Sequence, residues 1–257
     1  MKTEILTKSS ELEQAWAKQY ERLARAFADM LGKKVRVIAE IGCGSGALTI
    51  PLAKHSSGLQ FVLVDRFEDT KHGSYSHNYK ALRSYLREEE LMKCTRVVVS
   101  DYLKWIKTQN DETYDVVVSC EFLPEISSAE TKQFLHECYR LLKPRGVSLH
   151  SFLSPVPRNI GQKLLITADS NPTWTNTPPK EWFSPKPNLV IKELRKSGFE
   201  RIRRVTIRSH LVMKADAAKS WLKDVEIKES FFEAHKRLLN TRGLEIPDWI
   251  IISGIKP

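Results

Sequence analysis

Apolar side chains near the start of the chain recur at steps of three and four residues. Such steps place side chains on one face of a helix, so the pattern predicts an amphipathic helix that packs its apolar face against the rest of the protein. Ser10 and Glu13 have the spacing of a capping box at the start of this helix. The predicted apolar face consists of Leu12, Trp16, Tyr20, Leu23, Phe27 and Leu31.

From residue 35 onward, short apolar runs alternate with amphipathic stretches. The runs predict buried strands at 35–41, 59–64, 95–99, 114–119 and 147–153. The stretches between them predict helices at 47–55, 75–90, 102–107 and 128–142. Regular alternation of strand and helix requires crossover connections, so we expect an α/β fold with a doubly wound, mostly parallel sheet.

Prolines interrupt this alternation between residues 155 and 187, where seven of the twelve prolines lie. Because proline lacks a backbone N–H and fixes φ, we expect no regular helix or central strand there, and we interpret 155–187 as a Pro-rich cap loop. Beyond it, the pattern predicts a helix at 188–197, a strand at 201–207, a helix at 215–239 and a last strand at 249–255. We expect these two strands to form an antiparallel pair at one edge of the sheet.

Basic residues outnumber acidic ones, with 41 Lys and Arg against 31 Asp and Glu among 257 residues. The resulting formal net charge of +10 favours anionic partners without identifying one. The densest basic segment, 192–208, has a net charge of +5 because only Glu193 and Glu200 oppose its basic side chains. These are Lys192, Arg195, Lys196, Arg201, Arg203, Arg204 and Arg208.

Several classes of protein are disfavoured by the composition. The longest purely apolar runs, 61–64 and 249–252, are far shorter than the roughly 20 residues that span a bilayer, so we expect no membrane partner. The first residues lack the apolar stretch of a secretory signal, and we expect a cytoplasmic protein. Cysteines 43, 94, 120 and 138 are too far apart for a metal knuckle, so we expect reduced core thiols and no metal site.

A glycine turn follows the first predicted strand. Gly42, Gly44 and Gly46 stand where a strand passes into a helix, and glycines at such a place let backbone approach a ligand closely. This pattern alone is weak, because Gly42, Gly44 and Ala47 also satisfy the GxGxxA fingerprint of dinucleotide sites.

Three acids stand at the ends of successive strands beside this turn. Glu40 ends the first strand, where a carboxylate would repel a pyrophosphate and attract an ammonium or sulfonium group. Asp65 ends the second strand and is placed to accept bonds from ribose hydroxyls, and Asp101 follows the third. Each acid taken alone can equally be a solvated carboxylate or a helix cap, but the three together favour a ligand site.

Residues 37–146 resemble the class I S-adenosylmethionine-dependent methyltransferases. The likeness lies in VIAEIGCGSG, FVLVD, SDY, DVVVSCEFLPEI and LLKPRG. It implies the strand order 3-2-1-4-5-7-6 with the last strand antiparallel. We expect an N-terminal helical lid at 1–31, formed by the helix that bears Trp16 and Tyr20, and a methyltransferase domain at 32–257. Arg145 stands where many members have glycine, and 119–124 read SCEFLP in place of the NPPY or DPPY sequence of amide and base methylation.

The resemblance also implies a cofactor, S-adenosyl-L-methionine, and roles for its binding residues. Glu40 and the three glycines would cradle the methionine part, and Asp65 would bind the ribose. Asp101 with the Tyr102 backbone would bind the adenine. Ser119 or Cys120 would contact the methionine end.

Residues for the acceptor side follow from chain position. Glu121 and His150 are the candidate general bases. Glu121 can equally hold a backbone amide, and a hydrogen-bonded core histidine is the more favoured interpretation of His150. We expect the substrate pocket to be lined by aromatic residues of the first helix and the Pro-rich loop, and by one histidine, unless these rings fill a satellite core. The pocket candidates are Trp16, Tyr20, Trp174, Trp182, Phe183 and His210.

The favoured function is methyl transfer to a nitrogen, oxygen or sulfur atom of a small molecule. The alternatives are an RNA or protein methyltransferase that docks through 192–208, and a methyltransferase-like binding module without turnover. RNA is less favoured because Phe199 is the only ring among those basic residues. A nicotinamide-dependent dehydrogenase is disfavoured by Glu40 and the third acid.

Overall fold

The computed structural model describes residues 4–6, 11–32, 34–67, 79–171, 173–174, 185–223 and 227–257. A seven-stranded sheet with the order β4-β3-β2-β5-β6-β10-β7 runs through it. All its strand pairs are parallel except those of β10, which runs antiparallel to β6 and β7. This confirms the predicted order and the antiparallel last strand. The strands are β2 Val37–Ile41, β3 Gln60–Asp65, β4 Thr95–Val99, β5 Tyr114–Cys120, β6 Leu142–Leu153, β7 Glu200–Ile207 and β10 Trp249–Ile255.

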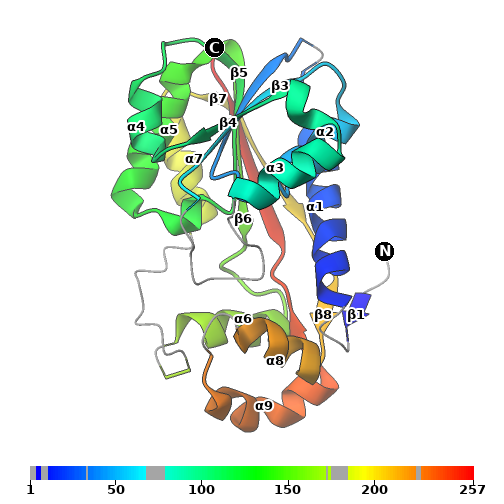
Figure 1. Cartoon of the computed structure of the whole chain (residues 1–257). Helices are drawn as coiled ribbons and strands as arrows, with labels where there is room; N and C mark the ends of the chain where they lie inside the picture. Colours follow the sequence, from blue (N-terminus) through cyan, green and yellow to red (C-terminus); the bar gives the residue numbers. More distant parts are fainter. Residues whose placement is uncertain are drawn as a thin grey trace.

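Helices cover both faces of the sheet (Figure 1). One face carries α1 Leu12–Ala28, α2 Thr49–His55 and α3 Tyr79–Glu88, and the other carries α4 Tyr102–Lys107, α5 Ser128–Leu141 and α7 Pro187–Lys196. Alternation along each strand explains the two cores, because Val116 and Val118 of β5 point into the first and Val117 into the second. Short 3₁₀ helices η2 Leu91–Lys93 and η3 Leu123–Glu125 complete this part.

A cap lies beyond the end of the sheet where β6 finishes (Figure 1). It contains α6 Ile160–Ser170, α8 Ala215–Lys223, α9 Glu229–Thr241 and a small sheet. The small sheet has the order β1-β8-β9, from β1 Glu4–Leu6, β8 Leu211–Met213 and β9 Leu244–Glu245. The cap therefore draws on three distant stretches of the chain, and its buried residues belong to the same core as α1 and α2.

Three expectations about helices are wrong. Helix α6 lies inside 155–187, because the prolines fall on both sides of 158–171 and Asn159 caps the helix through the Gln162 N–H at 3.0 Å. The single helix expected at 215–239 is two, since Lys228 is extended (φ −64°, ψ 143°) at the start of α9. The first helix has Glu11, not Ser10, at its N-cap, without a side-chain cap bond.

The position of α1 bears on the predicted lid. Its middle packs beside α2 with Leu23, Ala24 and Phe27 fully buried. Its first turns reach the cap, where Trp16 lies 6.2 Å from Trp221 of α8 between ring centroids. Closure over a ligand by this helix stays a prediction.

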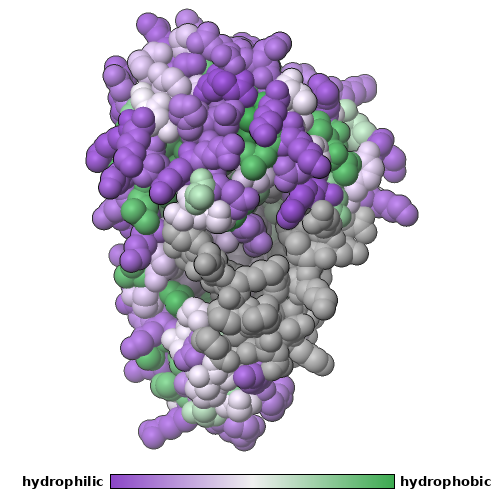
Figure 2. Space-filling model, turned by 90° about the vertical axis from the view of Figure 1, so that its left-hand side faces the viewer, coloured by the Kyte–Doolittle hydropathy of each residue, from purple (hydrophilic) through white to green (hydrophobic). Residues whose placement is uncertain are grey.

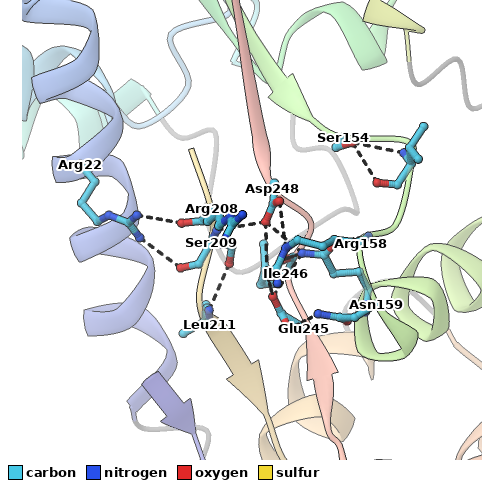
Figure 3. A network of polar contacts seen from close by, with 12 residues as sticks. Arg22, Ser154, Arg158, Asn159, Arg208, Ser209, Leu211, Glu245, Ile246 and Asp248 are labelled. Atoms are coloured by element: carbon cyan, nitrogen blue, oxygen red, sulfur yellow. Dashed lines mark hydrogen bonds and ion pairs between the residues drawn. The ribbon is translucent and has the colours of Figure 1, made fainter. Parts of the chain in front are cut away.

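A polar network joins the cap to the sheet (Figure 3). Asp248, just before β10, accepts bonds from Gln162 Nε2 at 3.0 Å, Arg158 Nε at 3.1 Å and the Ser209 N–H at 3.3 Å. Glu245 of β9 accepts bonds from Arg158 and Asn159 at the start of α6. The cap is therefore fixed at the sheet edge by hydrogen-bonded charges in addition to apolar contacts.

No described helix combines the length and the apolar character that a bilayer crossing requires.

Candidate functional site

The glycine turn has a backbone that side chains would obstruct. Gly42, Gly44 and Gly46 have φ values of 72°, 49° and 80°, in the left-handed region that favours glycine. A Cβ on Gly42 would lie 2.6 Å from Cδ2 of Phe122, and one on Gly46 would lie 2.7 Å from Leu82 Cδ1. The turn between β2 and α2 therefore needs glycine at both positions for conformation and for space.

Glu40 is a buried carboxylate directly before this turn. It is 2% exposed, and Thr49 at the start of α2 donates a hydrogen bond to its Oε2. Burial, and then the nearby charge of Asp65, raise the pKa of Glu40 well above its ordinary value. Among the described residues, no basic side chain forms an ion pair with it. A cationic group entering this place would stabilise the ionised form.

Asp65 at the end of β3 holds the turn in shape. Its Oδ2 accepts the Gly44 N–H at 2.9 Å and its Oδ1 accepts the Phe67 N–H at 2.8 Å. A carboxylate offers about four lone-pair positions, so these two bonds leave acceptor capacity for a ligand hydroxyl. Asp65 thus connects the glycine turn to the ribose position that the sequence predicts.

Asp101 is the N-cap of α4. Its Oδ1 accepts the Lys104 N–H at 3.1 Å, which is the helix-cap role considered as the alternative for this acid. The following Tyr102 is buried, and its ring packs edge-on against Phe122 at 5.0 Å and Phe134 at 5.8 Å between centroids. Asp101 and Tyr102 lie at the same sheet edge as Asp65, because β3 pairs in register with β4.

The structure places two of the predicted site residues, His150 and Ser119, together inside the sheet. The two residues pair across β5 and β6, and Ser119 Oγ lies 2.8 Å from His150 Nδ1. Ser148 Oγ lies 2.6 Å from Nε2, so both ring nitrogens have partners in a fully buried place. Burial lowers the pKa of His150 to about 3. His150 is a neutral core histidine, the interpretation the sequence favoured.

Glu121 differs from His150, because one oxygen of its carboxylate lacks a hydrogen-bond partner. Its Oε1 is buried and has no hydrogen-bond partner among the described residues. Burial raises the pKa of Glu121 to about 8, with a lesser contribution from Glu125 and an opposing one from the Leu153 N–H. The neighbouring Cys120 thiol has its pKa raised by burial and by the charges of Glu121 and Glu40. Both carboxylates therefore act on the Cys120 thiol at this edge.

An aromatic cluster lies where the sheet meets the cap. Trp249, which is 1% exposed, packs against Tyr20 at 5.7 Å and Trp16 at 6.5 Å between ring centroids, and Trp221 packs against Trp16. The Nε1 atom of Trp249 is buried without a hydrogen-bond partner among the described residues. Sequence reasoning missed Trp249 as a site residue, although its place at the start of an antiparallel last strand puts it at the edge where the parallel strands end.

The other predicted pocket residues are placed differently. Trp174 packs against Phe231 at 5.7 Å and His235 at 5.4 Å, which is the satellite core considered as the alternative. His210 is partly buried and follows Ser209, whose carbonyl accepts a hydrogen bond from Arg22. Burial lowers the pKa of His210, and the charges of Arg22 and Arg158 lower it further. Trp182 and Phe183 lie outside the described residues.

Metal ligation finds no support in the described part of the chain. No group of three His, Cys, Asp or Glu residues there is arranged to hold an ion, and the four cysteines are free thiols.

Comparisons with known proteins agree with this geometry. A family described as "Methyltransferase domain" matches residues 39–148. The tRNA N(3)-methylcytidine methyltransferase Mettl2 of Drosophila melanogaster is 27% identical over 132 residues, which are 51% of this chain and 38% of the fly protein. This chain therefore matches well under half the length of that relative.

Two solved structures share the fold. A SAM-dependent methyltransferase from Archaeoglobus fulgidus has a TM-score of 0.58 at 19% identity, covering 93% of this chain and 94% of that one. The Haemonchus contortus phosphoethanolamine N-methyltransferase 2, solved with S-adenosyl-L-methionine, has a TM-score of 0.56 at 15% identity, covering 93% and 52%.

The described residues fit this cofactor, because a buried acid without a basic partner stands beside a glycine turn that side chains would block. Residues 39–148 therefore carry a methyltransferase domain, and the chain shares its fold with S-adenosylmethionine-dependent methyltransferases.

Proposed function

We propose that the protein transfers a methyl group to a nitrogen, oxygen or sulfur atom of a small molecule by in-line displacement. The observation that carries this proposal is the cap, which lies beyond the sheet on the side where the parallel strands β2, β3, β5 and β6 end (Figure 1). A cap on that side suits a small acceptor, since such an acceptor can be held in line and separated from water. The fold shared with a phosphoethanolamine N-methyltransferase supports the same class of acceptor.

On the donor side, each residue has a role that its surroundings support. The cofactor supplies a methyl carbon that its sulfonium makes electrophilic. Glu40 would hold the methionine ammonium by charge, and Cys120 would lie beside the methionine end. Asp65 would accept a ribose hydroxyl while it holds the Gly44 amide. Asp101 and the Tyr102 backbone would border the adenine.

Calorimetry and a transfer assay test this function. We expect S-adenosylmethionine to bind and nicotinamide dinucleotide not to bind, and we expect radiolabelled methyl to appear in small acceptors. Binding of the dinucleotide alone would overturn the assignment. Cofactor binding without transfer to small molecules, tRNA or protein would instead support a binding module.

RNA is the second candidate acceptor, favoured by the likeness to a tRNA methyltransferase and by the exposed basic residues of α7 and β7. Figure 2 shows that the face over α4, α5 and α7 is largely hydrophilic. Two observations weigh against it. Phe199, the ring of the basic segment, is buried against Tyr139, so it is not available for base stacking. Moreover, β7 lies three strand spacings from β5, or about 14 Å.

A further inference from the structure

Glu121 holds a carboxylate oxygen that the protein does not satisfy. Its Oε1 is buried without a hydrogen-bond partner among the described residues. Native proteins rarely leave a buried polar atom unpaired, and such an atom at a candidate site points to a partner that arrives with a ligand. The Leu153 N–H lies against the same carboxylate and stabilises its charged form. The Glu121 carboxylate thus accepts one hydrogen bond from the protein and has one oxygen free to accept another from a ligand.

The backbone fixes this carboxylate in place. Glu121 has φ 54°, a left-handed conformation that side chains seldom adopt, and its N–H donates to the Ser151 carbonyl at 2.9 Å. The next residue, Phe122, packs so closely on Gly42 that no Cβ fits between them. Glu121 is therefore anchored on both β6 and the glycine turn, next to the place where the donor's methionine part would lie.

The charges that face Glu121 are negative. The charge of Glu125 in η3 raises the pKa of Glu121. The charges of Glu121 and of Glu40 from β2 in turn raise the pKa of the Cys120 thiol. No Lys, Arg or His of the described residues forms an ion pair with Glu121. A neutral alcohol or thiol would have to become an anion to react here, and neighbouring carboxylates disfavour an anion. An ammonium ion, by contrast, is attracted.

We propose that the acceptor is an amine that enters as an ammonium ion, and that Glu121 binds it through Oε1 and then takes its proton. This inference rests on the proposed small-molecule function. The N–H bond breaks and the proton passes to the Glu121 carboxylate. The freed nitrogen lone pair forms the N–C bond while the C–S bond breaks and leaves its electron pair on sulfur. One positive charge on nitrogen and a neutral thioether and carboxylic acid remain.

Two further observations agree with this role. A base works best when its pKa lies near the working pH, and burial raises the pKa of Glu121 to about 8. Leu153, whose amide contacts the carboxylate, pairs with Trp249 of the aromatic cluster. Aromatic faces attract cations and cover the apolar body of an amine.

The test compares Glu121→Gln with the wild-type protein and with Glu88→Gln, an exposed carboxylate of α3, as the matched control. The acceptors are a set of aliphatic and aromatic amines, each with the alcohol and thiol of the same skeleton, and total tRNA. We expect transfer to amines alone. Glu121→Gln should lower kcat/KM for the amine about 100-fold at pH 7.5, leave cofactor affinity within threefold, and approach the wild type above the amine's own pKa. Glu88→Gln should retain the wild-type rate.

The pH profile separates a base from a merely structural residue. In the wild type, kcat/KM should rise as Glu121 ionises with a pKa of about 8, whereas in the variant it should follow the amount of free amine. An equal loss at every pH, or loss of cofactor binding, would overturn the proposal. Transfer only to alcohols, thiols or tRNA would overturn it while keeping the methyltransferase assignment, and absence of cofactor binding in the wild type would remove both.

Discussion

Three acids at successive strand ends differ in what surrounds them. Glu40 is buried beneath the glycine turn, Asp65 binds two backbone amides, and Asp101 caps a helix. Their positions in the sequence did not distinguish these three surroundings. A residue at the end of a strand is known to lie at the edge of the sheet, but its hydrogen-bond partners depend on the rest of the fold. The shared place of the three acids at successive strand ends beside the glycine turn supplied the grouping, and the structure supplies the separate bonding of each acid.

Replacing Asp65 tests its double role. Asp65→Ala removes the acceptor of the Gly44 and Phe67 amides and of the proposed ribose hydroxyl. We expect S-adenosylmethionine to bind more weakly by about 1–3 kcal/mol, since partners of the missing carboxylate are left unpaired. Calorimetry measures this, with Asp111→Ala as the control because Asp111 makes an exposed ion pair with Arg140. Unchanged affinity in Asp65→Ala would show that the ribose lies elsewhere.

Glu121 should also affect the dependence of stability on pH. Its folded pKa of about 8 lies above the ordinary 4.5, so its contribution to stability is fully present below pH 4.5 and is lost as pH rises through 8. In Glu121→Gln the fall in the free energy of unfolding between pH 5 and pH 8 should be smaller, by roughly 2 kcal/mol once partial exposure is discounted. Urea unfolding at several pH values without cofactor measures the difference. Parallel curves for the two proteins would contradict it.

Elements with strong periodicity were predictable, and elements decided by distant contacts were not. The strands at 95–99 and 249–255 and the helix at 102–107 match the structure because each has a clear apolar pattern between breakers. Helix α6 was not predicted because the segment 155–187 as a whole is rich in proline. The prolines lie on either side of α6, and the helix itself contains none. The small sheet was missed because β1 and β9 have three and two residues, and only tertiary pairing defines them.

The same contrast applies to the candidate site. The glycine turn and Asp65 could be predicted as candidates, because a local sequence pattern identifies each of them. The orphaned oxygen of Glu121 and the place of Trp249 depend on how β5, β6 and β10 meet, which no single stretch encodes. His150 was ambiguous for the same reason, since its two serine partners come from different positions in the sheet.

The attachment of the cap depends on Asp248, which accepts bonds from α6 and from the segment before β8. Asp248→Asn removes the charge that faces Arg158. We expect a loss of about 1.5 kcal/mol in the free energy of unfolding, because Asp248 loses charged hydrogen bonds while the partly exposed Arg158 is screened by solvent. Hydrogen exchange should increase in α6 and β9 more than in β2 or β5. A uniform increase would indicate that the cap and the sheet unfold as one unit.

For the whole molecule, the net charge of +10 and the basic residues of α7 and β7 favour association with anionic partners. Neutralising Arg203 and Arg204 together should leave small-molecule turnover unchanged, since β7 is the outermost strand beyond β10. Any affinity for RNA should fall. The slope of the logarithm of the binding constant against the logarithm of the salt concentration should become less steep by about one unit for each phosphate that the protein no longer neutralises. Filter binding over a salt series measures this. Loss of small-molecule turnover in the doubly neutralised protein would contradict this prediction, and strongly salt-dependent RNA binding by the wild type would favour the RNA candidate.

The outer side of β7 leaves backbone groups that no further strand pairs within the described chain. Such a border invites a second copy to extend the sheet, and positive side chains in a row discourage it by mutual repulsion. The arginines of β7 can therefore keep the protein monomeric as well as bind anionic partners. A variant without them should self-associate at high concentration. Polyanions or concentrated salt should promote the same self-association in the wild type.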